Sequence, residues 1–188
     1  MTIDTLIQAA IEREGGYSNH PADRGGPTRW GVTEAVARAN GYRGDMLALP
    51  REEAVAIFKR LYWLRPGFNR VAEHAPAIAA ELFDTGINMG PAIATGFLKR
   101  ALNALNRNEA DYDDVDATPV IDDATIAALA AFMARRGQGG ETVLLKALEA
   151  LQGERCVRLA ETRPANEVFL YGWLANRVGT PGTIQVRP

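Results

Sequence analysis

Helical spacing of apolar residues is the feature that most limits how this chain of 188 residues can fold. Apolar side chains recur every three or four residues through most of the sequence, which is the spacing of one face of an α-helix. The clearest segment is 76–89, which is apolar nearly all round and therefore predicts a buried central helix. No long segment alternates between apolar and polar residues as an exposed strand would. The fold is therefore predicted to be mostly α.

Capping residues predict where several helices begin and end. Thr2 or Asp4 can cap the first helix, which is expected to end at Gly15-Gly16. Thr33 can cap a second helix and Pro50 can open a third. A short irregular β-hairpin after the first helix, around residues 17–32, is the only β structure expected. Further helices are predicted over residues 122–135, 141–162 and 165–177.

An acidic stretch separates two parts of the chain. Residues 108–120 are rich in Asp and include Pro119, which is typical of a solvated connection. The sequence thus predicts a first region over 1–107, a linker over 108–120, a helical half over 121–178 and a flexible tail over 179–188.

Composition excludes several classes of function. Lys and Arg number 21 against 23 Asp and Glu, so the net charge of −2 argues against binding nucleic acid through its phosphates. Cys156 is the only cysteine and there are two histidines, which cannot build a His- or Cys-based structural zinc site. No metal or cofactor is expected. Neither a membrane-spanning run nor a signal peptide is recognisable, so we expect synthesis in the cytoplasm and no membrane insertion.

Residues 14–33 differ from the rest of the chain. Glycines, prolines, polar side chains and aromatic rings are concentrated there, directly after the first predicted helix. A loop of this composition fixed to a rigid helix suits a binding or reacting surface.

Glu14 is the main catalytic candidate in this segment. It follows apolar positions of the first helix by three, four and seven residues, so helical spacing places it on the apolar face. Lost hydration and the negative end of the helix dipole both raise the pKa of a carboxyl there. A carboxylic acid that keeps its proton can protonate a glycosidic oxygen. Alternatively, Glu14 pairs with Arg13, Arg24 or Arg29, and the glycines only end the helix.

Four more residues of the segment are candidates. Asp23 could orient water or stabilise positive charge on a sugar, or it could be an ordinary turn residue. Thr28 could hold a water, or its hydroxyl could bond only to local backbone. Tyr17 and Trp30 could stack on sugar rings, or they could cover the core.

Asp84 and Asn88 lie four residues apart on the predicted buried helix, hence on one of its faces. The pair could brace a cleft wall, since buried polar groups are bonded to partners. Asn88 could alternatively contact substrate directly.

The segment Glu14-Gly15-Gly16-Tyr17, together with the run over 23–33, resembles the glycoside hydrolase family 108 lysozymes, or N-acetylmuramidases. The resemblance covers nearly the whole chain, and the first of these segments is its specific part. It continues through residues 61–63, 83–90, 102–103, 151–155 and 169–177.

This resemblance implies a lysozyme-like α fold in which Glu14 corresponds to the family's essential catalytic glutamate. The substrate would be the β-1,4 bond between N-acetylmuramic acid and N-acetylglucosamine in peptidoglycan glycan strands, and the second half would be a peptidoglycan-binding region. Family members include phage or prophage endolysins and secretion-associated muramidases. Release through a holin or an exporter, with action in the periplasm or cell wall, would fit the missing signal peptide.

The second half departs from the family pattern at residues 116–125. A glycine-rich turn is replaced there by Asp116-Ala117-Thr118-Pro119-Val120-Ile121-Asp122-Asp123-Ala124-Thr125. This half therefore either binds the wall or completes the hydrophobic core. Two other functions stay open: a non-catalytic peptidoglycan-binding or phage structural protein, and a lytic transglycosylase or chitinase that uses the same glutamate.

Overall fold

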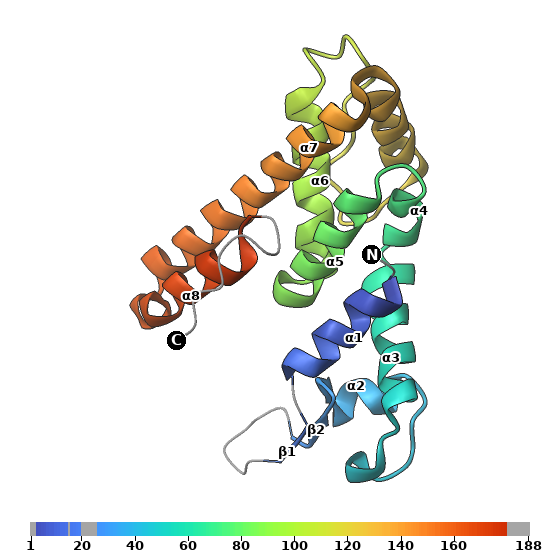
Figure 1. Ribbon diagram of the computed structural model, residues 1–188, viewed down its shortest axis with the longest axis vertical. Coiled ribbons are helices and arrows are strands. Elements are labelled where there is room, and N and C mark those ends of the chain that lie inside the picture. The colour runs from blue at the N-terminus through green and yellow to red at the C-terminus, as the bar shows by residue number, and fades with distance from the viewer. Residues whose placement is uncertain (1–2, 15, 20–25, 180–188) are drawn as a thin grey trace. The chain divides into compact units, whose positions relative to one another are not determined.

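The computed structural model describes residues 3–14, 16–19 and 26–179. The chain divides into two compact units, one over residues 1–66 and one over residues 67–188. Helices dominate both units (Figure 1). Each unit buries apolar side chains of its own.

The first unit is a small helical core with a short sheet. Its helices α1 and α3 pack against each other. The sheet residue Val32 and the buried faces of these helices form the core, in which Ile7, Ile11 and Ile57 are at most 1% exposed. The elements are α1 (Ile3–Glu14), β1 (Tyr17–Ser18), β2 (Thr28–Arg29), β3 (Val32–Thr33), α2 (Glu34–Ala39), η1 (Met46–Ala48), α3 (Arg51–Lys59) and the π-helical turn η2 (Arg60–Leu64).

The expected hairpin is present as three antiparallel two-residue strands in the order β1-β2-β3. Tyr17 lies opposite Arg29, and Thr28 lies opposite Thr33. Trp30 turns the chain between β2 and β3 with a φ of 55°, a left-handed conformation that is uncommon for a non-glycine residue. This irregular turn fixes the position of an aromatic ring beside the sheet.

Capping in the first unit follows the sequence in two places. The Thr33 hydroxyl accepts a hydrogen bond of 3.4 Å from the backbone N–H of Val36 and caps α2, and Pro50 stands immediately before α3. At the first helix, Asp4 lies within the first turn of α1, and Thr2 lies outside the described residues. The helix ends at Glu14, as its glycines predict.

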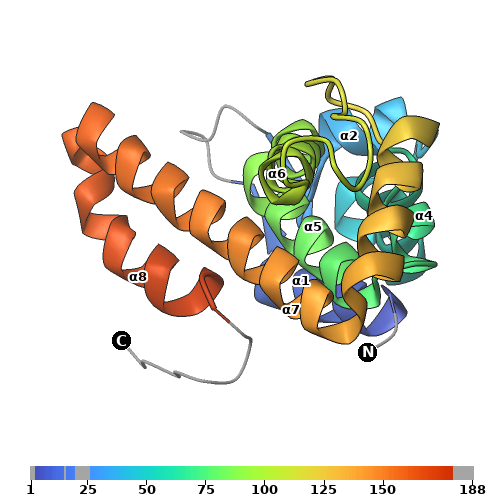
Figure 2. The same ribbon diagram turned by 90° about the horizontal axis from the view of Figure 1, so that it is seen from above.

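The second unit is built around α5, which packs against α4, α6 and α7. Ile78, Leu82 and Phe83 of α5 are at most 2% exposed, so the prediction of a buried helix over 76–89 is confirmed. Helix α8 lies beside the later part of α7 in both views (Figure 1, Figure 2). The elements are α4 (Phe68–Ala72), α5 (Pro76–Met89), α6 (Pro91–Leu105), α7 (Asp123–Thr162), η3 (Pro164–Asn166) and α8 (Glu167–Arg177).

The two helices expected over 122–135 and 141–162 are both present, as the two arms of α7 (Asp123–Thr162). The two parts form one element that changes direction at Gly137, whose φ of 57° and ψ of −154° are not helical (Figure 1). Glycine adopts this backbone conformation without the penalty that a Cβ would add. Just after the kink, the Glu141 carboxylate accepts hydrogen bonds from the Ala77 N–H (3.0 Å) and the Gln138 amide (2.7 Å), which fixes the later arm of α7 against the start of α5.

The acidic segment 108–120 lies against α6 within the second unit. The Asn103 side chain donates to the carbonyl of Val115 and accepts from its N–H, both at 2.9 Å. The Tyr112 hydroxyl donates to the Leu102 carbonyl at 2.8 Å. The second compact unit therefore continues through this segment. The boundaries predicted from composition, before residue 108 and after residue 120, stay a prediction.

Asp122 joins α7 to the buried amine of Lys99. Its carboxylate caps α7 by accepting from the N–H (2.8 Å) and the hydroxyl (2.6 Å) of Thr125, and it accepts from Lys99 Nζ at 3.0 Å. Lys99 is 1% exposed. The bonds from Thr125 first, and then the one from Lys99, lower the pKa of Asp122. A lowered pKa means that this stabilisation is present above the ordinary pKa and is lost on acidification.

We expect Asp122→Ala to lower the free energy of unfolding by about 3 kcal/mol, because it leaves Lys99 buried without its carboxylate and removes the cap of α7. Urea unfolding followed by circular dichroism at pH 7 measures the loss. The matched control is Asp123→Ala, because that side chain is 97% exposed in its ion pair with Arg70. Its expected loss is below about 1 kcal/mol. Equal losses for the two variants would contradict the assignment.

Candidate functional site

Position 14 lies at the end of α1, three residues after Ile11, which is 1% exposed. The side chain of Glu14 lies outside the part of the chain that the structure describes, and so does all of Asp23. Their catalytic roles therefore stay predictions. What the structure adds is that the helix leading to position 14 is anchored in the core on the face predicted from its spacing.

Thr28 lies on β2 and is half-buried. Its hydroxyl donates a hydrogen bond of 3.3 Å to the carbonyl of Gly26, a local backbone bond of the kind that the sequence left open. The role of this hydroxyl in holding a water stays a prediction.

The two aromatic candidates differ in how firmly they are held. The Trp30 indole N–H donates to the Leu49 carbonyl at 3.0 Å, and the guanidinium of Arg29 lies 5.1 Å from the centre of the Trp30 ring. That distance suits a cation–π contact. Tyr17 lies on β1 and is 41% exposed. Trp30 is thus fixed beside the sheet, whereas the ring of Tyr17 is accessible.

Polar side chains form a stripe along one face of α5 at Glu81, Asp84, Thr85 and Asn88, which are spaced three and four residues apart. The Asn88 amide donates to the Asp84 carboxylate at 3.0 Å, which confirms that these two side chains share a face. The Thr85 hydroxyl donates to the Glu81 carboxylate at 3.2 Å.

Glu81 was not among the residues singled out from the sequence. Burial raises its pKa from 4.5 to about 7, the charges of Asp84 and Glu149 add to the rise, and the Thr85 hydrogen bond opposes it. The available signal was a second carboxylic acid, three residues before Asp84, on a helix that is apolar on most of its surface. Helical periodicity could not reveal every cause of the raised pKa of Glu81, because Glu149 lies on a different helix, α7.

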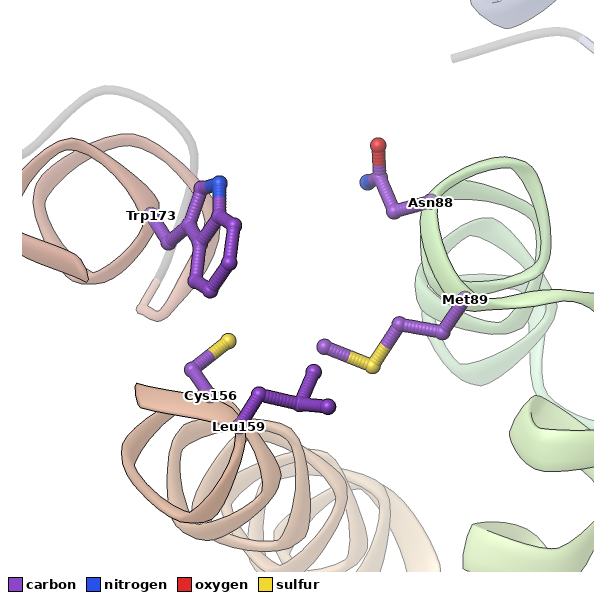
Figure 3. Close-up of a pocket in the computed structure, with 5 residues that line it drawn as sticks. All are labelled: Asn88, Met89, Cys156, Leu159 and Trp173. Carbon is purple, nitrogen blue, oxygen red and sulfur yellow. The ribbon is translucent and has the colours of Figure 1, made fainter. Parts of the chain in front are cut away.

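A pocket of about 140 Å³ opens beside the end of this stripe (Figure 3). Asn88 and Met89 line it from α5, Cys156 and Leu159 from α7, and Trp173 from α8. Cys156 is 1% exposed. Of the five lining residues, only Asn88 was a candidate from the sequence.

The described residues offer neither a metal site nor a membrane-spanning segment. Within them, no group of three or more His, Cys, Asp or Glu side chains is placed to hold a metal ion. No helix in the same part of the chain has both the length and the apolar character needed to cross a bilayer.

Comparison with known families accounts for both halves of the sequence. Residues 7–90 match the model of glycosyl hydrolase 108, and residues 94–178 match that of a predicted peptidoglycan domain. The chain carries a glycosyl hydrolase 108 domain followed by a predicted peptidoglycan domain. It is a glycoside hydrolase, and the pairing of the two domains makes it a peptidoglycan hydrolase that acts on the cell wall.

Ten solved chains match this glycosyl hydrolase 108 protein, whereas no curated protein does. One of the solved chains is described as the structure of Brucella abortus SagA. It has a TM-score of 0.64 and 23% sequence identity, over 92% of this chain and 87% of that one. The likeness shows the fold. A mostly helical, lysozyme-like domain with a short hairpin after its first helix and a helical C-terminal half is confirmed.

Proposed function

We propose that the protein is a muramidase that hydrolyses the β-1,4 bond between N-acetylmuramic acid and N-acetylglucosamine, with Glu14 as the general acid. The observation that carries the proposal is the match of residues 7–90 to glycosyl hydrolase 108, in which Glu14 ends a helix anchored in the core. A carboxyl at the negative end of a helix dipole and close to apolar groups keeps its proton to higher pH than one in water.

In this mechanism Glu14 donates its proton to the glycosidic oxygen as the bond from that oxygen to the anomeric carbon breaks. The leaving sugar departs as an alcohol, and positive charge develops on the ring that stays behind. Asp23 stabilises this charge or orients a water, assisted by Thr28. The water adds its oxygen to the anomeric carbon and gives its proton to a carboxylate, which is Asp23 in an inverting reaction and the deprotonated Glu14 in a retaining one, so one water is consumed for each bond cleaved. A separation of about 6.5–9.5 Å between the two carboxyls would imply inversion, and about 5 Å retention.

The aromatic and amide candidates supply contacts to the glycan. Tyr17 offers an accessible ring and Trp30 a fixed one, and both can pack against the C–H face of a sugar. Asn88, which lies on α5, contacts the glycan strand. The biological setting that fits is a phage or prophage endolysin, or a secretion-associated wall hydrolase, that reaches the periplasm through a holin or an exporter.

Digestion of purified peptidoglycan tests the reaction. We expect the wild-type chain to clear a wall suspension and to release fragments with reducing N-acetylmuramic acid ends, identified by mass spectrometry after borohydride reduction. Fragments with anhydro ends would show instead that the enzyme is a lytic transglycosylase. Cleavage of chitin, with peptidoglycan left intact, would show that it is a chitinase. Sedimentation of the protein with the wall without any release of fragments would leave only a binding protein.

A further inference from the structure

We propose that the pocket formed by Asn88, Met89, Cys156, Leu159 and Trp173 is a subsite for one N-acetylhexosamine residue, and that it takes the acetamido arm of the sugar. This inference rests on the proposed function for the identity of the glycan. It assigns a task to α8, which takes no part in the proposed mechanism.

The arrangement of the lining residues sets a polar group against an aromatic one over an apolar floor. Asn88 and Trp173 lie on opposite sides of the opening, and the side chains of Met89, Cys156 and Leu159 come together between them (Figure 3). An N-acetylated sugar carries groups that match these three parts: an amide for the polar side, a flat C–H face of the ring for the aromatic side and a methyl group for the apolar floor.

The hydrogen bond between Asn88 and Asp84 determines what the amide can offer a ligand. Asn88 Nδ2 donates to Asp84 Oδ2 at 3.0 Å, so the acceptor that this amide offers a ligand is Oδ1, which points away from the apolar floor in Figure 3. The acetamido N–H is a donor, so the two groups are complementary. A hydroxyl at the same position on the sugar is a shorter group and brings no methyl to the floor.

Trp173 is held in place by its neighbour on α8. The rings of Phe169 and Trp173 are stacked, with centroids 6.1 Å apart and planes inclined at 21°. A fixed indole presents a flat apolar surface at little conformational cost, which suits packing against a pyranose ring.

The pocket has room for the acetamido arm of one sugar. Its volume is about 140 Å³, which accommodates the four heavy atoms of an acetamido group. The pocket is open to solvent, so the ring and the rest of the glycan can extend outside it.

The pocket also joins the two family regions inside one compact unit. Asn88 and Met89 fall within residues 7–90, and the other three lining residues fall within residues 94–178. The predicted peptidoglycan domain would therefore hold glycan together with α5 rather than as an independent module.

The test is a titration of the full-length Glu14→Gln chain, labelled with ¹⁵N and followed through the indole N–H signals of its three tryptophans. Trp173→Phe assigns the signal of interest. The probes are chitotetraose and cellotetraose, which share the β-1,4 linkage and differ by acetamido against hydroxyl. We expect the Trp173 signal to shift with chitotetraose and the apparent Kd for cellotetraose to be at least tenfold weaker. Absence of a shift, or equal affinity for both probes, would overturn the proposal.

Two variants add a check at the level of single residues. Asn88→Leu should raise the Kd for chitotetraose about tenfold by removing the acceptor, and Tyr171→Ala should leave it unchanged because that side chain is 71% exposed on α8 and does not line the pocket. An unchanged Kd for Asn88→Leu would reject the pocket. If this variant does not fold, as judged from its thermal melt, the comparison of the two probes decides alone.

Failure of this inference can be told apart from failure of the proposed function. If chitotetraose shifts the Trp173 signal but the wild-type protein cuts no peptidoglycan, the sugar subsite is supported and the muramidase activity is rejected. If the protein cuts peptidoglycan but the signal does not shift, the activity is supported and the subsite is rejected.

Discussion

Glu14→Gln should lower the rate of peptidoglycan cleavage by at least a hundred-fold while the chain stays folded. Glutamine has nearly the same shape as glutamic acid but no proton to give to the glycosidic oxygen, and a positioned general acid contributes about 10²–10⁴ to the rate. The measurement is the initial rate at which the turbidity of a wall suspension falls, with circular dichroism to show that the helices are intact.

The matched control is Glu12→Gln on the same helix. Glu12 is exposed and forms an ion pair of 3.3 Å with Arg51, which at the surface contributes little to stability. We expect its rate to stay within about twofold of wild type, since surface substitutions are usually mild. Clearing by Glu14→Gln at the wild-type rate would remove Glu14 from the chemistry, whatever the control shows.

Glu81→Gln should stabilise the protein at pH 8 and change little at pH 4. The pKa of Glu81 is about 7 in the folded protein and 4.5 ordinarily. An acid with a raised folded pKa contributes stability that is complete below its ordinary pKa and is lost as pH rises through the folded pKa. At 1.36 kcal/mol for each pKa unit, the cost of ionising Glu81 at pH 8 is about 3 kcal/mol. Glutamine stays neutral and can still accept the hydrogen bond from Thr85.

Urea unfolding at pH 4, 6 and 8 measures this effect. The wild-type free energy of unfolding should fall between about pH 5 and 7 relative to that of Glu81→Gln. Glu154→Gln is the control, because that carboxylate is 51% exposed in an i,i+4 pair with Arg158. An equal gain at pH 4 and pH 8 would show that the charge of Glu81 is not the cause.

Local patterns predicted most of the helices because caps and apolar spacing act within a few residues. The bounds of α5, the cap at Thr33 and the end of α1 all depend on neighbours in sequence. The two arms of α7 were predicted as two helices because a glycine-rich stretch interrupts the pattern, and the chain does bend there, at Gly137. The bonds from Ala77 and Gln138 to Glu141 contribute to the observed arrangement, and one of them comes from α5.

The candidate site, too, was predicted from the sequence only where it depends on neighbouring residues. Helical spacing placed Asp84 and Asn88 on one face, and their hydrogen bond confirms it. The roles of Glu14 and Asp23 stay predictions. The pocket at Trp173 was not predicted, because its walls come from three helices, and α5 is far in sequence from the other two.

The sequence by itself determined the helical class and the short hairpin after the first helix, since both depend on residue types at short spacings, and residues 7–90 carry the match to glycosyl hydrolase 108. Only the tertiary structure decided which polar groups lose water and which side chains meet. Burial in the packed interior is the largest cause of the raised pKa of Glu81, and the charge of Glu149 from α7 adds a smaller contribution. Desolvation and pocket walls are properties of a packed interior, and a packed interior exists only after distant segments have come together.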